Sequence, residues 1–284
     1  MSSSSAHTDI PGLFDVRGRS YVVTGAASGL GLAMAEALVA NGARVLLLDQ
    51  NAQELASAAA RLGGNTVHRA VDVADSAALH EAVLSFAQVS GRIDGMFANA
   101  GISGGPGFGT VAGAQSGRLQ EQSMGQWNHI IQVNLHGVLN SIQSVVTTMK
   151  SQRHGSIVVT ASIAGMKAEP FVSYAYAVAK AAVIQLVRQS ALELAAFGIR
   201  VNAISPGFIC THIAGGRLHD PQVESDLVQK IPLGRLGEPH EIQGVALLLA
   251  SDAGSYITGN VLSIDGGVLL GNPSPGQLQI EESV

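Results

Sequence analysis

The stretch Ser20-Tyr-Val-Val-Thr24-Gly25-Ala-Ala-Ser28-Gly29-Leu30-Gly31 joins an apolar run to a turn with three glycines. We expect the run to form a strand and Leu32 to Asn41 to form an amphipathic helix. Glycines let a backbone approach a pyrophosphate closely, and a helix N-terminus offers amide donors and a positive dipole to an anion. The order of strand, turn and helix predicts a phosphate-binding loop. Its spacing differs from the commoner G-x-G-x-x-G, and an ordinary tight loop is the alternative.

The next apolar run, Ala43-Arg-Val-Leu-Leu-Leu-Asp49, ends in a carboxylate. A carboxylate at this place can accept hydrogen bonds from the ribose hydroxyls of an adenosine, and it would repel a 2′-phosphate. Neither Gln50-Asn51 nor the glycine-rich turn holds a lysine or arginine. The residues therefore favour NAD over NADP, with a simple strand-end cap as the alternative reading of Asp49.

Tyr176-Ala-Val-Ala-Lys180 places a phenol and an ammonium four residues apart, on one face of an expected helix. A free tyrosine has a pKa of about 10, and a nearby cation stabilises the phenolate and lowers that pKa. Tyr176 is therefore a candidate general acid/base. The pattern Y-x-x-x-K also arises by chance on helices, so its weight comes from the nucleotide-binding pattern upstream.

Together these features make the chain resemble the short-chain dehydrogenase/reductase family, in its common soluble, single-domain branch. The resemblance covers residues 15 to 267 and rests on short motifs that follow one another in the family's order. They are Thr24 to Gly31, Asp72-Val73, Asn99-Ala100-Gly101, Asn134, Ser162, Tyr176 with Lys180, Pro206-Gly207 through Thr211, and Asp265-Gly266-Gly267.

The resemblance implies a role for each matching residue. Ser162 would hydrogen-bond the substrate oxygen, Tyr176 would pass the proton, and Lys180 would hold the nicotinamide ribose and lower the tyrosine pKa. Asn134 would complete a water-mediated proton relay; the alternative is an internal helix amide beside a kink. The residues implied to bind the cofactor are Gly25, Ser28, Gly29, Leu30, Gly31, Asp49, Asp72, Val73, Asn99, Ala100, Gly101, Tyr176, Lys180, Pro206, Gly207, Ile209 and Thr211.

The chain departs from the family pattern between its catalytic residues. Fourteen positions separate Ser162 from Tyr176, one more than is usual, so we expect Met166 to Ser173 to bulge. Tyr174 is a rival proton donor, but Val178 occupies the place where a partner lysine would stand. We therefore keep Tyr176 as the expected acid/base.

Short apolar runs alternate with helical stretches, around Tyr21, Val45, Val67, Gly95, Ile157, Arg200 and Val261. This rhythm predicts an α/β fold, a Rossmann-like doubly wound parallel sheet of about seven strands with helices on both faces. Ligands bind at the carboxyl ends of the strands in such sheets. We expect one catalytic domain over residues 15–267, with a flexible N-terminal tail over 1–14 and a C-terminal tail over 268–284.

The composition argues against several other functions. A net charge of −5 without a basic run disfavours nucleic-acid binding, and no stretch approaches the roughly 18 apolar residues of a membrane span. The nine histidines are scattered and Cys210 is the single cysteine, so we expect no metal site and no internal disulfide. Residues 1–7 lack the features of a signal peptide, and a cytoplasmic location is expected.

Charged residues make up only 13% of the chain, about half the usual share, which favours self-association. The expected helix from Tyr176 to Phe197 is apolar on most sides, and Leu135 to Met149 is similarly poor in charge. A helix that is apolar on most sides must be covered on most sides. We predict that these two segments form the interface of a homodimer or homotetramer, unless loops of the same chain cover them.

Two segments bear on the substrate. Gly101 to Asn134 spans 33 positions, about ten more than the family usually has, and residues 102–117 hold too many glycines to keep a fixed shape unaided. This insertion is either a mobile wall of the substrate pocket or a surface excursion at an oligomer edge. A second segment, Ile209 to Val228, is expected to close over the site and offers Ile209, Ile213 and Leu218 but few charges. An apolar or weakly polar substrate is favoured over a phosphorylated or carboxylated one.

We therefore expect an NAD-dependent oxidoreductase that interconverts a secondary alcohol and a ketone by hydride transfer. The alternative from another class is a non-catalytic NAD(H)-binding redox sensor or assembly module. The presence of Asn134, Ser162, Tyr176 and Lys180 together favours the enzyme.

Overall fold

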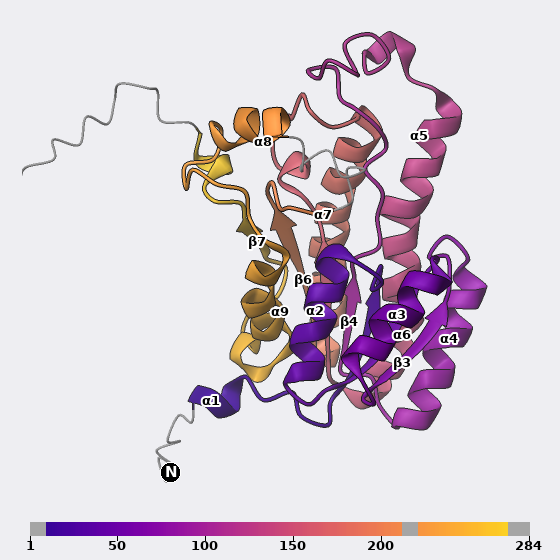
Figure 1. Cartoon of the computed structure of the whole chain (residues 1–284). Helices are drawn as coiled ribbons and strands as arrows, with labels where there is room; N and C mark the ends of the chain where they lie inside the picture. The colour runs from indigo at the N-terminus through magenta and orange to yellow at the C-terminus, as the bar shows by residue number, and fades with distance from the viewer. Residues whose placement is uncertain (1–9, 212–220, 272–284) are drawn as a thin grey trace, which may run out of the picture.

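The computed structural model describes residues 10–211 and 221–271, and its framework is one parallel sheet with helices on both faces (Figure 1). The seven strands lie in the order β3-β2-β1-β4-β5-β6-β7, and all neighbours are parallel. The predicted α/β fold class and the seven expected strands are confirmed. They are β1 (Ser20–Thr24), β2 (Arg44–Asp49), β3 (Thr66–Ala70), β4 (Gly95–Ala98), β5 (Gly155–Thr160), β6 (Ile199–Pro206) and β7 (Val261–Ile264).

The helices connect these strands, as expected for repeated β-α-β units. They are α1 (Ile10–Leu13), α2 (Gly29–Ala40), α3 (Ala52–Leu62), α4 (Ser76–Ser90), α5 (Met124–Ile131), α6 (Gly137–Gln152), α7 (Tyr174–Leu194), α8 (Pro221–Val228) and α9 (Gln243–Ala250). A π-helical turn over Gln132–His136 joins α5 to α6. Helix α2 begins at Gly29, three residues before the predicted start, so its first turn lies inside the glycine-rich motif.

Two apolar cores cover the two faces of the sheet. On one face α4, α6 and α7 pack through residues such as Leu79, Val145 and Val187. On the other face α2, α3 and α9 pack through residues such as Met34 and Leu249. Strands β1, β4 and β5 are buried along their whole length, which explains why they read as continuous apolar runs.

The order of the strands determines where a ligand can bind. Strand β1 lies between β2 and β4, so the chain first builds the sheet in one direction and then in the other. Connections leave the carboxyl ends of β1 and β4 toward opposite faces and open a crevice between them. The glycine-rich turn follows β1, and Asn99 follows β4, so both predicted motifs lie at this crevice.

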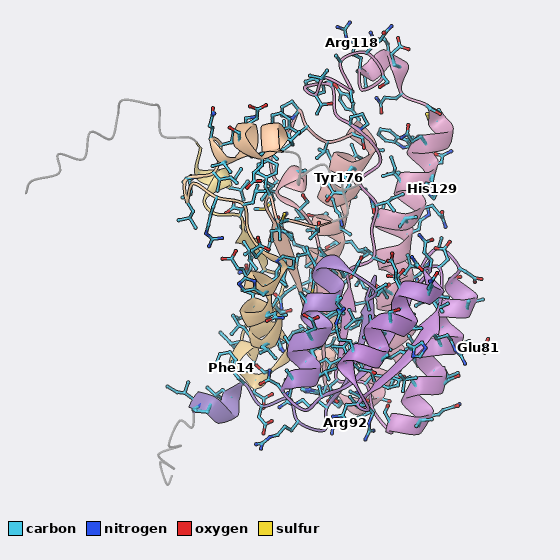
Figure 2. The ribbon with its side chains drawn as sticks, in the orientation of Figure 1. Phe14, Glu81, Arg92, Arg118, His129 and Tyr176 are labelled. Atoms are coloured by element: carbon cyan, nitrogen blue, oxygen red, sulfur yellow. The ribbon has the colours of Figure 1, made fainter. Side chains whose placement is uncertain are left out.

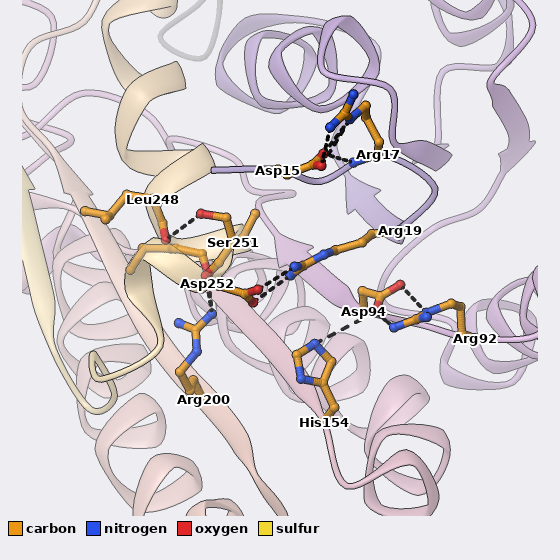
Figure 3. A network of polar contacts seen from close by, with 12 residues as sticks. Asp15, Arg17, Arg19, Arg92, Asp94, His154, Arg200, Leu248, Ser251 and Asp252 are labelled. Atoms are coloured by element: carbon orange, nitrogen blue, oxygen red, sulfur yellow. Dashed lines mark hydrogen bonds and ion pairs between the residues drawn. The ribbon is translucent and has the colours of Figure 1, made fainter. Parts of the chain in front are cut away.

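The amino ends of the strands carry a network of ion pairs (Figure 3). Asp94, whose side chain is fully buried, accepts a hydrogen bond from the backbone amide of Ser20 at 2.8 Å and pairs with Arg92. Arg19 donates two hydrogen bonds to Asp252, at 3.0 and 2.8 Å. Because a buried carboxylate is tolerated only when it is paired, this network fixes the start of β1 against the C-terminal part of the chain.

The folded part extends beyond the expected limits of the domain. Ile10–Leu13 is a helical turn within the segment expected to be a flexible tail. Val268 is buried in a 3₁₀ turn over Val268–Leu270, within the expected C-terminal tail. The rest of both predicted tails, residues 1–9 and 272–284, lies outside the described residues. Within the described ranges, no helix has the length and apolar character that crossing a bilayer requires.

Candidate active site

The loop after β1 and the loop after β4 are in backbone contact. Gly25 has φ +65°, and a Cβ there would lie 2.8 Å from the Cα of Ala100. A Cβ on Gly31 would overlap the carbonyl oxygen of Gly25. The Asn99 side-chain amide donates to the carbonyls of Thr24 and Gly25, at 3.2 and 3.3 Å. The glycines are therefore required for this close packing, which forms one wall of a cavity.

Asp49 lies across this wall at the end of β2. Its carboxylate accepts hydrogen bonds from the backbone amides of Ala27, at 3.1 Å, and Asn51, at 3.0 Å. Ser28, Gly29 and Leu30, at the N-terminus of α2, line the same part of the cavity as Asp49. A helix N-terminus opposite a fixed carboxylate suits a ligand that carries both a phosphate and a ribose.

Helix α7 brings Tyr176 and Lys180 to the opposite wall. The helix starts at Ser173, whose hydroxyl accepts a hydrogen bond from the Tyr176 amide at 3.3 Å. Lys180 is only 2% exposed, and its Nζ donates to the carbonyl of Thr160 at 2.6 Å. The same Nζ lies 5.7 Å from the centre of the Tyr176 ring. Figure 2 shows Tyr176 well inside the outline of the molecule.

Ser162 follows β5 and completes this group. Its Oγ accepts a hydrogen bond from the Ala164 amide at 3.2 Å, and it is also hydrogen-bonded to the Tyr176 side chain. Ser162, Tyr176 and Lys180 all line the cavity, so the structure brings these three predicted residues together. Tyr174 does not line it and stacks instead on Phe108, with ring centres 5.8 Å apart.

Burial shifts the pKa values of Tyr176 and Lys180. Burial raises the pKa of Tyr176 above its usual value, and the hydrogen bond from Ser162 opposes that rise. Burial also lowers the pKa of Lys180 to about 8. The net direction of the Tyr176 pKa shift is upward, because dehydration of the phenolate is its largest cause. The expected lowering of the tyrosine pKa by Lys180 stays a prediction.

Asn134 lies in the π-helical turn and is fully buried. Its side-chain Oδ1 accepts from the Ile102 amide at 2.8 Å, and its Nδ2 donates to the Ile102 carbonyl at 2.7 Å. Asn134 does not itself line the cavity, but it fixes the backbone next to Gly101, which does. The contacts match the internal-amide reading, and the relay role stays a prediction.

Two predicted cofactor residues lie away from the cavity. The Asp72 side chain is exposed, and its Oδ1 accepts from the Ala74 amide at 2.9 Å. Val73 is buried, and its carbonyl accepts from the Asn140 side chain at 2.9 Å. Neither residue lines the cavity, because Asp72 accepts from the turn that leads into α4 and Val73 packs against α6. Gly31 is also outside the lining, since it lies behind Gly25.

The cavity has a volume of about 1020 Å³ and runs from Asp49 past Tyr176 to α8. Its lining includes the other predicted cofactor residues: Gly25, Ser28, Gly29, Leu30, Asp49, Asn99, Ala100, Gly101, Tyr176, Lys180, Pro206, Gly207, Ile209 and Thr211. Ile213 and Leu218, expected to close over the site, lie outside the described residues.

Sequence reasoning missed three charged residues at the far end of the cavity, which are Glu169, Asp226 and Lys230. The unusual spacing between Ser162 and Tyr176 was the available signal for Glu169. No sequence pattern pointed to α8. Among the described residues, no group of histidine, cysteine, aspartate or glutamate is arranged to hold a metal ion.

Comparisons with known proteins agree with this geometry. Residues 25–269 match the family model of enoyl-(acyl carrier protein) reductases. The chain is 39% identical to the 3-oxoacyl-(acyl-carrier-protein) reductase FabG of Thermotoga maritima, over 90% of this chain and 99% of that protein. The chain belongs to the short-chain dehydrogenase/reductase family. The predicted resemblance is therefore confirmed, and the chain is an oxidoreductase of that family.

Other relatives differ in substrate, and one was solved with a bound cofactor. The galactitol 2-dehydrogenase (L-tagatose-forming) of Cereibacter sphaeroides is 34% identical, over 90% of this chain and 96% of that protein. A protein of Beutenbergia cavernae, assigned as an NAD(P)-dependent gluconate 5-dehydrogenase, was solved with NADP bound at low occupancy. It aligns with a TM-score of 0.82 and 33% identity, over 91% of this chain and all of that one. Family membership thus establishes an oxidoreductase acting on a small molecule with a nicotinamide cofactor.

Proposed function

We propose that this protein is an NAD-dependent oxidoreductase that interconverts a secondary alcohol and a ketone, with Tyr176 as the general acid/base. One observation carries the proposal. Ser162, Tyr176 and Lys180 meet at one wall of the cavity whose other end holds the glycine-rich turn and Asp49. A dinucleotide lying along that cavity would have its reactive ring beside the phenol.

The residues of the cavity fit a nicotinamide dinucleotide. Gly25 and the N-terminus of α2 would hold the pyrophosphate, because both line the cavity and the glycines at positions 25 and 29 carry no Cβ. Asp49 would accept hydrogen bonds from the adenosine ribose, and Lys180 would contact the nicotinamide ribose. When bound, the cofactor supplies the hydride acceptor or donor.

The residues of this chain handle the proton. Ser162 would donate a hydrogen bond to the substrate oxygen and hold it near Tyr176 Oη. In the oxidation direction Tyr176 Oη accepts the hydroxyl proton, and in reduction it returns that proton to the carbonyl oxygen. Lys180 would keep a positive charge near the phenolate, and Asn134 would hold the backbone at Gly101 in place.

We further propose a preference for NAD over NADP. The Asp49 carboxylate would repel a 2′-phosphate. The described basic residues that line the cavity are Lys180, in the catalytic wall, and Lys230, just after α8, and neither belongs to the part around Asp49. The Beutenbergia protein was solved with NADP bound, so the cofactor preference of this chain needs its own kinetic comparison. We also retain the predictions of a cytoplasmic location and of a homo-oligomer.

The test compares wild type with Tyr176→Phe in a screen of secondary alcohols and ketones, followed by the absorbance of the reduced nicotinamide. The variant should lose about 10² to 10⁴ of kcat, the usual contribution of general acid/base catalysis, and should still bind NADH. Wild-type oxidation should speed up as the pH rises, because burial raises the Tyr176 pKa and the phenolate is the active form. Near-normal turnover by Tyr176→Phe would refute the mechanism.

The same assay decides the cofactor. We expect a higher kcat/KM with NAD than with NADP, and a smaller difference between the two in Asp49→Ser. Failure of wild type to turn over any alcohol or ketone, combined with tight NADH binding, would favour the non-catalytic sensor instead.

A further inference from the structure

The two places where this chain departs from the family's usual spacing pack against each other. They are the insertion over residues 102–117 and the lengthened segment Met166 to Ser173. Pro106 and Val172 form an antiparallel bridge. The Gly107 amide donates to the Phe171 carbonyl at 3.2 Å, and the Gly109 amide donates to the Pro170 carbonyl at 2.8 Å. The two segments therefore form one continuous wall of the cavity.

This wall carries a carboxylate in a defined position. Glu169 immediately precedes the bridged residues and lines the cavity, although its side chain is only 7% exposed. Lys167 Nζ lies 3.0 Å from its Oε1 and also donates to the Val268 carbonyl at 3.1 Å. Lys167 is not part of the cavity lining, so it holds Glu169 from behind. Among the described residues, none donates a hydrogen bond to the second oxygen, Oε2.

The rest of the wall balances the charge. Helix α8 contributes Asp226 and the turn after it contributes Lys230, whose ammonium lies 3.7 Å from the centre of the Phe171 ring. Two carboxylates and two ammonium groups thus surround this end of the cavity, if Lys167 is included. A cationic substrate would meet Lys230, and an anionic one would meet Glu169 and Asp226. A neutral substrate fits the wall best.

An apolar neutral substrate would still be disfavoured. Such a ligand would displace water from the Glu169 carboxylate and supply nothing in its place, and an unsatisfied buried charge is costly. A hydroxyl group would donate a hydrogen bond to the carboxylate and remove that cost. A site built to bind a hydroxyl discriminates strongly against analogues that lack it.

We propose that Glu169 determines substrate specificity by accepting a hydrogen bond from a hydroxyl that is not the reacting one. The substrate is accordingly a polyhydroxylated alcohol or the corresponding hydroxyketone. This inference rests on the proposed alcohol–ketone chemistry and narrows it. The sequence analysis favoured an apolar or weakly polar substrate, and this inference replaces the apolar substrate with a polyhydroxylated one.

The experiment compares substrates of equal carbon number, a set of hexitols (galactitol, sorbitol and mannitol) against 2-hexanol, by kcat/KM with NAD. Wild type should prefer at least one hexitol. Glu169→Leu should lower kcat/KM for that hexitol about 10- to 100-fold, the range expected for a lost hydrogen bond to a charged group. It should leave kcat/KM for 2-hexanol unchanged or higher. Glu169→Gln keeps hydrogen-bonding atoms and should retain the hexitol preference. It also tests the inference if the leucine variant does not fold.

The matched control is Glu81→Leu on the exposed surface of α4, at the end of the molecule away from Tyr176 (Figure 2). It should change neither rate. An equal loss for both substrates in Glu169→Leu would overturn the inference, as would an unchanged substrate ratio. If wild type oxidises 2-hexanol but no hexitol, the inference fails while the proposed function stands. If wild type oxidises neither substrate and reduces no matching ketone, the proposed function itself fails.

Discussion

Lys180 is a buried cation whose only hydrogen-bond partner among the described residues is the Thr160 carbonyl. Its pKa is lowered from 10.5 to about 8 by burial. The unfolded chain therefore binds more protons than the folded chain between these two pH values. Stability should rise with pH across that window, because the folded state holds the neutral amine at less cost than the ammonium.

This gives a prediction for Lys180→Met. Relative to wild type, the variant should be more stable near pH 8 and should lose the gain in stability that wild type shows between pH 8 and 10.5. The difference should be at most about 3 kcal/mol, because each pKa unit corresponds to about 1.4 kcal/mol. Urea unfolding at several pH values measures it, with Lys150→Met at the surface as control. Parallel pH profiles for wild type and Lys180→Met would contradict the prediction.

At the level of single residues, the sequence predicted the cavity residues that belong to a short motif. Tyr176 and Lys180 share a helix face, and Asp49 ends a strand, so their neighbourhood is local in sequence. Asp72 does not line the cavity, because its position after a strand says nothing about the direction of its side chain, and its cofactor role stays a prediction. Glu169 was missed because its surroundings depend on Val268, which holds Lys167, and on the insertion, and both lie far from it in the sequence.

At the level of elements, the glycine content of the insertion over residues 102–117 did not predict its conformation. We expected residues 102–117 not to keep a fixed shape unaided, and the glycines allow tight backbone contacts that other residues would block. A Cβ on Gly113 would overlap the carbonyl oxygen of Gly107. The Gly113 amide also donates to the Thr110 hydroxyl at 2.9 Å. The partner that orders this segment, Pro170 to Val172, could not be identified from the sequence.

A test of this element is Gly113→Ala. Overlap with the Gly107 carbonyl should force the segment apart and lower its local free energy of opening by about 1 to 3 kcal/mol. Amide hydrogen exchange should show faster exchange at Gly107 and Gly109, whose amides hold the wall together. The control is Gly64→Ala, where a Cβ meets no atom within 4 Å. Unchanged exchange in Gly113→Ala would mean that the glycine is not needed for the fold of the wall.

For the whole molecule, the fold was predictable because apolar runs and helices alternate with little interruption. The expected doubly wound sheet put the motifs at the carboxyl ends of the strands, and the structure then gave the order of those strands. The ion-pair network at the opposite edge was not predictable, because Asp94 and Asp252 find Arg92 and Arg19 only after the sheet has formed. The two edges are thus specialised, one for stability and one for binding.

The surface of the whole molecule leads to the last prediction, that α6 and α7 form a subunit interface. On this surface Leu139, Val178 and Leu192 are 37%, 48% and 79% exposed. Exposed apolar side chains gathered on two adjacent helices favour association. Light scattering at micromolar concentration should show a dimer or tetramer for wild type.

A carboxylate placed in such an interface would be buried without a partner, so Val178→Glu with Leu192→Glu should shift the protein toward monomer. The control is Val89→Glu on α4, where valine is 83% exposed and no interface is expected. A strictly monomeric wild type, or a double variant that stays assembled, would show that these helices do not form the interface.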